Sequence, residues 1–212
     1  MSMKFQNRHQ AGLWLASILK KHSIPDDFLI FGLTRGGVVV AAAISETIGK
    51  KMYPLVVKKI ARTSDPEFAL GAIGPQNSVW WDEKTLSYLN ISKKEKENLK
   101  NEVEKEVKSR QQLFGKDTPS VKGKIVIVVD DGVATGATAA AAAIFLRKRG
   151  AGKIVLATPV ISSSAYQILT KYYSKIIYAI SSKNLSSVGE FYNEFPQITD
   201  AEVLALLDKK YT

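Results

Sequence analysis

The sequence predicts an α/β fold built on a doubly wound, mostly parallel sheet of five strands flanked by helices. Short runs rich in valine and isoleucine alternate along the chain with longer stretches that carry a helical pattern. The short runs are apolar at consecutive positions, which is typical of parallel strands covered by helices on both faces. In such a sheet, ligands bind beyond the carboxyl ends of the strands, where the strand order reverses.

The elements follow one another in a regular order. Strands are expected at residues 28–33, 55–60, 124–129, 153–160 and 175–180, and helices at 38–48, 91–114, 138–149, 164–171 and 200–209. Residues 62–80 contain several glycines, prolines and polar side chains, so a long loop or an irregular hairpin is expected there. The 212 residues fit a single domain, 1–212, whose core covers about 28–180.

The composition restricts the class of protein. Apolar residues make up 45% and charged residues 24% of the chain, as in ordinary globular proteins. No apolar run approaches the roughly 18 residues of a membrane span. The first ten residues lack a signal-peptide pattern, and the absence of cysteine excludes disulfides and thiolate metal sites. A cytoplasmic protein with no membrane partner is the plain interpretation.

The formal net charge of +10 favours partners that carry phosphate, although an inert basic surface would give the same value. Many of the charged residues lie in residues 91–114, where lysine and glutamate are mixed around a stripe of Leu99, Val103 and Val107. That segment has no interleaved aromatic residues of the kind found in grooves for single-stranded nucleic acid. We therefore do not expect nucleic acid to be the partner.

The stretch VVDDGVATGAT, residues 128–138, follows an apolar strand with two acids and then a loop of glycine and threonine. A loop between a strand and a helix exposes successive backbone N–H groups, which bind phosphate. A Walker A loop is excluded because Ala137, rather than lysine, follows Gly136, and the dinucleotide pattern G-x-G-x-x-G is absent. The remaining alternative is an Asp-Gly turn before a helix capped by threonine.

This string closely resembles the signature of the type I phosphoribosyltransferases, which consists of four apolar residues, two acids and a Gly/Thr loop. The resemblance implies the fold described above and the binding of phosphoribosyl pyrophosphate. Asp130 and Asp131 would be the catalytic acids, which hold the ribose hydroxyls and Mg²⁺. The resemblance assigns the 5′-phosphate to Gly132, Val133, Ala134, Thr135, Gly136, Ala137 and Thr138.

A second turn, GLTRGGV at residues 32–38, also joins an expected strand to an expected helix. It is another anion cradle, with a guanidinium built in. In the family that the chain resembles, the loop after the first core strand binds pyrophosphate. Thr34, Arg35, Gly36 and Gly37 fall at that place.

A basic residue at the end of the next strand would reach the same pyrophosphate. Side chains alternate along a strand, so Lys58 and Lys59 cannot both face the ligand, and we favour Lys58. Both could instead be ordinary lysines at the edge of the sheet. Arg62, at the start of the next loop, is a further candidate. By resemblance, residues 62–80 would be the catalytic flexible loop that closes over the ligand.

The chain ends, about 1–27 and 181–212, would form a hood that selects the acceptor in the family resembled. In this hood, Phe191, Tyr192 and Phe195 could stack on a base or could anchor the last helix. His9 and His22 lie in the N-terminal segment and are interpreted as surface or packing residues.

The resemblance implies a Mg²⁺-dependent enzyme that transfers ribose 5-phosphate from phosphoribosyl pyrophosphate to a nitrogen of a small acceptor, commonly a nucleobase, and releases pyrophosphate. Ala134 stands where hypoxanthine-guanine members carry an aspartate, but adenine-type and regulatory members also lack it, so the acceptor is not identified. The alternative is a regulatory sensor of nucleotides or phosphoribosyl pyrophosphate, with or without nucleic-acid binding. Because family members are often dimers, a homodimer is expected.

Overall fold

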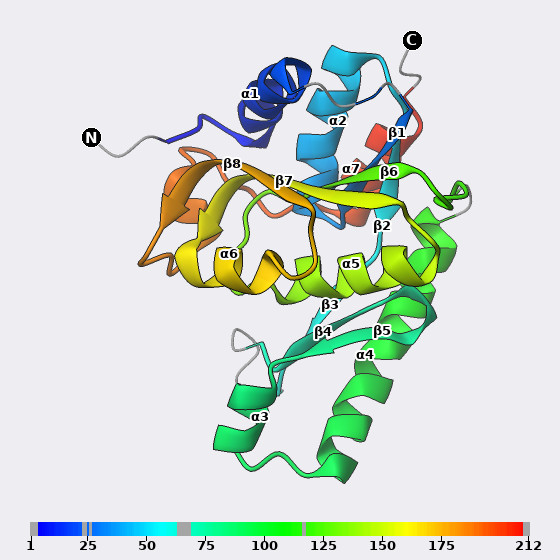
Figure 1. Ribbon diagram of the computed structural model, residues 1–212, viewed down its shortest axis with the longest axis vertical. Helices are drawn as coiled ribbons and strands as arrows, with labels where there is room; N and C mark the ends of the chain where they lie inside the picture. Colours follow the sequence, from blue (N-terminus) through cyan, green and yellow to red (C-terminus); the bar gives the residue numbers. More distant parts are fainter. Residues whose placement is uncertain (1–3, 23–24, 26, 63–68, 116–117, 210–212) are drawn as a thin grey trace.

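Five parallel strands form the central sheet of the computed structural model, which describes residues 4–22, 25, 27–62, 69–115 and 118–209. These strands are β1 (Phe28–Leu33), β2 (Met52–Leu55), β6 (Ile125–Val129), β7 (Lys153–Ser162) and β8 (Lys175–Ser182). Their order is β2-β1-β6-β7-β8, so the strand order reverses between β1 and β6. The doubly wound α/β fold predicted from the sequence is confirmed (Figure 1).

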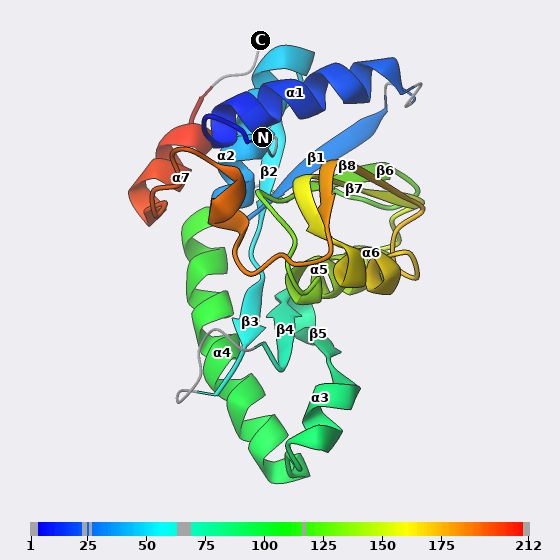
Figure 2. The ribbon, with the colours of Figure 1, turned by 90° about the vertical axis from the view of Figure 1, so that its left-hand side faces the viewer.

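Helices cover both faces of this sheet, and the apolar runs of the strands therefore have two buried sides. The helices α1 (Arg8–Lys21), α2 (Gly36–Ile48) and α7 (Asp200–Leu207) lie on one side, and α5 (Ala137–Lys148) and α6 (Ser163–Leu169) lie on the other (Figure 2). Ile30 and Ile127 belong to the core under α1 and α2, whereas their chain neighbours Phe31 and Val128 belong to the core under α5. All four side chains are fully buried.

A second, three-stranded antiparallel sheet was not expected. It consists of β3 (Lys58–Ile60), β4 (Gly71–Gly74) and β5 (Ser78–Trp81), with a short 3₁₀ turn, η1 (Pro75–Asn77), between the last two. The single strand expected at 55–60 is wrong, because the chain leaves the central sheet after Leu55 and enters the second sheet at Lys58. Of the two alternatives for 62–80, an irregular hairpin is present at 71–81, and residues 63–68 lie outside the described part of the chain.

Gly71, one of the glycines that suggested a loop, marks a close approach of two strands instead. A Cβ on Gly71 would lie 2.5 Å from the Trp80 carbonyl oxygen and 2.7 Å from the Trp81 ring. Glycine in a strand often marks such a contact, so loop-forming composition is a poor guide at this place.

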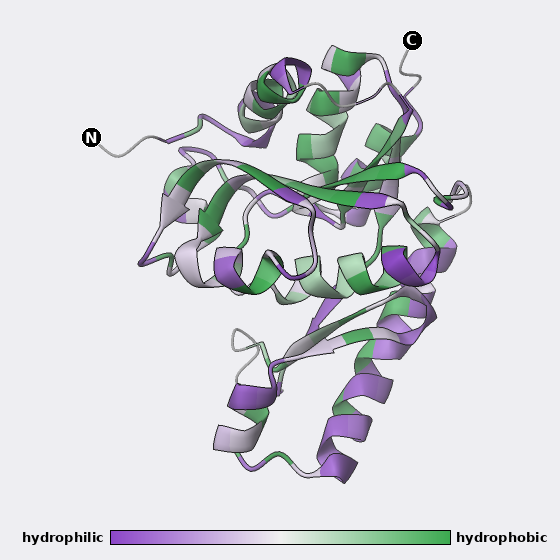
Figure 3. Cartoon of the chain, viewed as in Figure 1, coloured by the Kyte–Doolittle hydropathy of each residue, from purple (hydrophilic) through white to green (hydrophobic). Residues whose placement is uncertain are grey.

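Two helices, α3 (Glu83–Tyr88) and α4 (Lys93–Phe114), complete a lobe around the second sheet, and Figure 1 shows this lobe extending from the central sheet. Helix α4 packs with Leu99, Val103 and the buried Val107 toward the core, and most of its remaining surface is hydrophilic (Figure 3). Lysine and glutamate pair along that surface, as Lys100 does with Glu97 and Lys108 with Glu104, so the charges of this helix largely balance one another.

Segments near the two ends of the chain, around Phe5 and Tyr192, lie together beside the carboxyl edge of the sheet. Phe5 forms an isolated parallel bridge with Tyr192, and its amide donates to the Phe191 carbonyl at 2.9 Å. Helix α1 then crosses α2 so closely that a Cβ on Gly12 would lie 2.6 Å from the Ala43 Cβ. This packing fixes the start of α1, at Arg8, next to the end of β6. Among the described residues, no helix is both long and apolar enough to span a bilayer.

Candidate active site

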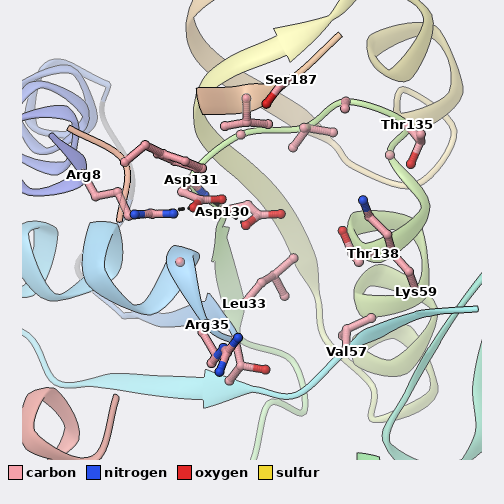
Figure 4. A pocket seen from close by; sticks show the side chains of 18 of the residues that line it. Arg8, Leu33, Arg35, Val57, Lys59, Asp130, Asp131, Thr135, Thr138 and Ser187 are labelled. Carbon is pink, nitrogen blue, oxygen red and sulfur yellow. Dashed lines mark hydrogen bonds and ion pairs between the residues drawn. The ribbon is translucent and has the colours of Figure 1, made fainter. Parts of the chain in front are cut away.

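A cavity of about 400 Å³ lies at the carboxyl ends of β1 and β6, where the strand order reverses (Figure 4). This is the place at which open α/β sheets bind their ligands. The structure brings eleven of the predicted site residues to its wall: Thr34, Arg35, Gly36, Asp130, Asp131, Gly132, Val133, Ala134, Thr135, Gly136 and Thr138.

The loop after β6 is held open as a cradle by contacts on its outer side. The Val133 amide donates to the Val160 carbonyl at 2.8 Å, and the Ser162 hydroxyl donates to the Ala134 carbonyl at 2.5 Å. Gly136 caps α5 with a left-handed backbone, φ = +81°, which favours glycine over other residues. Because β7 binds the outer side of the loop, the inner side faces the cavity at the N-terminus of α5, a favourable place for an anion.

The loop after β1 touches the two acids so closely that only glycine fits. A Cβ on Gly36 would lie 1.9 Å from Oδ2 of Asp131, and a Cβ on Gly37 would lie 2.5 Å from the Val129 carbonyl oxygen. Gly37 therefore packs behind the cavity rather than lining it. The Thr34–Arg35 peptide bond in the same loop is cis.

Three other predicted residues lie away from the cavity. Ala137 is fully buried at the first position of α5. Arg62 pairs with Glu95 of α4 at 2.8 Å, and Lys58 pairs with Glu106 of the same helix.

The preference for Lys58 over Lys59 is therefore reversed by the geometry. Lys58 turns toward α4, and the alternation of β3 turns Lys59 to the opposite side, where it lines the cavity. Figure 4 shows Lys59 entering the cavity from the side opposite Arg8. The sequence had limited the choice to one of the two lysines, but the face of β3 was decided by the unexpected second sheet.

The two adjacent acids differ in their surroundings. Oδ1 of Asp130 accepts the Asp131 amide at 2.9 Å, and burial, together with the Asp131 carboxylate, raises the pKa of Asp130 well above its usual value. Asp131 instead has a cationic partner, because Nε of Arg8 donates to its Oδ2 at 2.7 Å. Reasoning from the sequence missed Arg8, since nothing in the segment around it distinguishes it from a surface arginine.

The aromatic residues of the hood pack against neighbouring side chains, so their rings are not freely exposed for stacking on a base. Tyr192 is buried, its hydroxyl donates to the Asp131 carbonyl at 2.6 Å, and its ring lies 4.9 Å from that of Phe195. Burial raises the pKa of Tyr192 far above its usual value, so this hydroxyl stays a donor. Phe195 lines the cavity and carries the Arg8 guanidinium 3.6 Å above its ring, while Phe191 packs against the cluster around Phe5.

The two histidines do not line the cavity. His9 is 3.5 Å from Glu46 and exposed, and His22 contacts Lys175 at 3.0 Å. The cations at the cavity are Arg8, Arg35 and Lys59, against the two carboxylates of Asp130 and Asp131. With the backbone N–H groups of two loops added, the cavity favours an anionic ligand that also presents hydroxyl groups to the acids.

A family model described as the phosphoribosyl transferase domain matches residues 13–191. The chain belongs to this family. The resemblance found in the loop at 128–138 is thereby confirmed. Two relatives from strains of Mycobacterium tuberculosis, each named "Putative phosphoribosyl transferase", are 32% identical over 209 residues, which is 98% of this chain and 47% of theirs. The chain thus spans about half the length of these relatives.

Solved structures of similar proteins have the same architecture. The crystal structure of TT1426 from Thermus thermophilus matches with a TM-score of 0.74 and 31% identity, over 97% of this chain and 98% of that one. A hypothetical protein from Neisseria gonorrhoeae, solved with bound ppGpp, matches with a TM-score of 0.51 and 13% identity, over 98% of each chain. At that identity the second match shows the fold alone.

Replacing Asp130 by asparagine is expected to raise the melting temperature of the ligand-free protein at pH 7. The raised folded-state pKa means that folding takes up a proton, so stability is lost as the pH rises above about 3.9, the usual value for an unfolded chain. Neutral asparagine avoids this cost, so the gain should shrink as the pH falls toward about 4. Melting curves between these pH values measure it.

The matched control for this experiment is Asp131→Asn, which breaks the largely buried pair with Arg8 and should lower the melting temperature at pH 7. A gain for Asp130→Asn that is equal at both pH values, or no gain at all, would contradict the assignment of Asp130 as the acid that is costly to ionise.

Proposed function

We propose that the protein is a Mg²⁺-dependent phosphoribosyltransferase, which transfers ribose 5-phosphate from phosphoribosyl pyrophosphate to a nitrogen of a small acceptor and releases pyrophosphate. One observation carries the proposal. Two glycine-rich loops at the ends of adjacent parallel strands enclose one cavity, and the two acids lie where the loops meet. Membership of the family supports the same activity.

The ligand has three parts, and the cavity offers a matching group for each. The loop at 132–138 would take the 5′-phosphate through its backbone N–H groups and threonine hydroxyls. The loop at 34–36, with Lys59 across the cavity, would take the pyrophosphate. Asp130 and Asp131, between the two loops, would accept hydrogen bonds from the ribose 2′- and 3′-hydroxyls.

The acids also fit a magnesium ion. No group of three or more histidine, aspartate or glutamate side chains suited to a metal occurs in the described part of the chain. Mg²⁺, however, commonly binds through one or two carboxylates together with the phosphates of a substrate, and Asp130 and Asp131 supply that set. When bound, the ion would neutralise charge on the leaving pyrophosphate.

The protein itself would act mainly by electrostatics and positioning. Cleavage of the bond between ribose and pyrophosphate leaves positive charge on the sugar, and the carboxylates lie beside the proposed ribose position to stabilise it. Arg35 and Lys59 would stabilise the departing negative charge. No covalent nucleophile is required, which agrees with the position of His9 and His22 outside the cavity lining.

The acceptor would enter beside the hood, next to Ser186, Ser187 and Val188. Tyr192 is committed to the Asp131 carbonyl, so base stacking in this hood would rest on the exposed part of Phe195. A homodimer, a cytoplasmic location and the absence of a nucleic-acid partner stay predictions from the sequence.

Calorimetric titration with phosphoribosyl pyrophosphate and Mg²⁺ tests the proposal, followed by a pyrophosphate-release assay with adenine, guanine, hypoxanthine, uracil and orotate. Binding and release with one base are expected. Binding without release would instead favour a regulatory sensor, so ppGpp, the ligand of the Neisseria gonorrhoeae structure, is titrated as a competitor. Absence of binding would contradict the proposal.

Replacing Lys59 by methionine is expected to weaken the binding of phosphoribosyl pyrophosphate by about tenfold, since a charged hydrogen bond to phosphate is worth about 1.5 kcal/mol or more. Lys58→Met is the matched control, because Lys58 is the adjacent residue and pairs with Glu106 away from the cavity. Calorimetry on both variants measures the difference. The assignment of Lys59 is wrong if the two variants lose affinity equally.

A further inference from the structure

Arg8 joins three segments that are far apart in the sequence. It is the first residue of α1, and Asn7 before it caps the helix by accepting the Gln10 amide. Its Nε donates to Oδ2 of Asp131 at 2.7 Å, and its Nη1 donates to the Pro196 carbonyl at 2.8 Å. Both chain ends of the hood therefore meet one of the two acids through this guanidinium, as Figure 4 shows for Arg8 and Asp131.

The guanidinium is restrained by contacts with Phe195 and Gly36 as well as by its hydrogen bonds. Its Cζ lies 3.6 Å from the centre of the Phe195 ring. Gly36 is also close, since a Cβ there would lie 3.0 Å from Nε of Arg8. The side chains of Arg8 and Asp131 are 8% and 15% exposed. Arg8 therefore holds Asp131 more firmly than the partners of a surface ion pair hold each other, because little water competes for the charges.

Within the part of the chain that the structure describes, the Asp131 carboxylate is held through Oδ2. Arg8 takes Oδ2, while the Tyr192 hydroxyl holds the backbone of the same residue through its carbonyl. Asp131 lines the cavity, so its other oxygen can accept a hydrogen bond from a ligand. Such fixing of a binding group by a neighbour lowers the cost of ordering it when the ligand arrives.

We propose that Arg8 is a positioning residue for the ribose: it holds Asp131 in the orientation that accepts a ribose hydroxyl. The proposal rests on the proposed function, because it takes the ligand to carry a ribose. It adds that the hood acts on the sugar-binding acid as well as on the acceptor. Arg8 acts through Asp131 and not through direct contact with phosphate.

A double-mutant cycle tests this with ribose 5-phosphate and inorganic pyrophosphate as separate probes. The variants are Arg8→Met, Asp131→Asn and the two together, and affinities are measured by calorimetry. Arg8→Met is expected to weaken the binding of ribose 5-phosphate by about tenfold in the parent protein. The same change should weaken it by less than about twofold when Asp131 is already asparagine. Pyrophosphate affinity is expected to change by less than about twofold.

The matched control is Gln6→Ala. Gln6 joins the same two chain ends, through Glu194 at 2.7 Å and Asn193 at 2.9 Å, and neither of these contacts involves Asp131. It should leave the affinity for ribose 5-phosphate unchanged. Arg8→Lys, which keeps the charge, should recover part of the affinity lost in Arg8→Met.

Three outcomes would overturn the proposal. An equal loss in both backgrounds of the cycle would mean that Arg8 only stabilises the fold. An equal loss for pyrophosphate would mean that Arg8 binds phosphate directly. A loss in Gln6→Ala as large as in Arg8→Met would mean that any loosening of the chain ends has this effect.

Hydrogen exchange on the ligand-free protein separates a failure of this proposal from a failure of the proposed function. Amides of residues 130–136 are expected to exchange faster in Arg8→Met than in Gln6→Ala. If the parent protein binds neither ribose 5-phosphate nor phosphoribosyl pyrophosphate, the proposed function is wrong, and exchange alone decides whether Arg8 positions Asp131. Equal exchange in the two variants would refute the role of Arg8.

Discussion

Replacing Asp130 and Asp131 together by asparagine is expected to weaken the binding of phosphoribosyl pyrophosphate by about 100-fold or more. Each acid would lose a charged hydrogen bond to a ribose hydroxyl, and such bonds are worth about 1.5–3 kcal/mol each. The direction of the effect is informative. Removing two negative charges from a cavity that binds an anion should raise affinity if only the net charge mattered.

The matched control changes the net charge by the same amount elsewhere. Glu97→Gln with Glu104→Gln removes two carboxylates from α4, where they pair with Lys100 and Lys108 away from the cavity. Calorimetry with Mg²⁺ present should give the parent affinity for this control. Unchanged or increased affinity in the variant of the two aspartates would contradict their assignment to the ribose.

Replacing Gly36 by alanine is expected to weaken the binding of phosphoribosyl pyrophosphate by about tenfold or more, although α2 itself should tolerate the change. Alanine favours a helix by about 1 kcal/mol over glycine, so the helix is not the cause of the loss. The added methyl would lie 1.9 Å from Oδ2 of Asp131, and relieving such an overlap typically costs about 1–3 kcal/mol. The acid would move away from Arg8 or from the ribose position.

The matched control for this variant is Gly74→Ala in β4, where the nearest atom to the new methyl, Cγ2 of Val57, lies at an ordinary 3.4 Å. Calorimetry and melting curves of both variants separate an effect on the site from an effect on the fold. Equal ligand affinity in the two variants would show that the contact of Gly36 with Asp131 does not shape the site.

The sheet and the two loops were predictable because local patterns specify them. Strands β1, β6 and β7 are buried on both faces, so they appear in the sequence as uninterrupted apolar runs. The loop at 128–138 must combine apolar strand residues, acids and glycines within eleven positions, and few other folds require that combination. Thr34, Gly36, Asp131 and Thr135 could therefore be placed at one cavity from the sequence.

The remaining parts depend on contacts between distant segments. Lys59 reaches the cavity because β3 joins a second sheet packed between α5 and α4. No local sequence pattern predicts this sheet. Arg8 reaches Asp131, 123 residues away in the sequence, through the docking of α1 on α2. Phe195 and Tyr192 were recognised as hood aromatics, but their contacts with Arg8 and Asp131 depend on the same docking.

Amide NMR shifts on titration with each half of the ligand test most directly the central claim that the two loops bind one phosphoribosyl pyrophosphate. With ribose 5-phosphate, the largest shifts are expected at residues 130–138, and with pyrophosphate and Mg²⁺ they are expected at residues 34–37. Phosphoribosyl pyrophosphate should shift both sets at once, because the two loops line one cavity. Shifts outside these residues at saturating ligand, or the same set for both halves, would contradict the account.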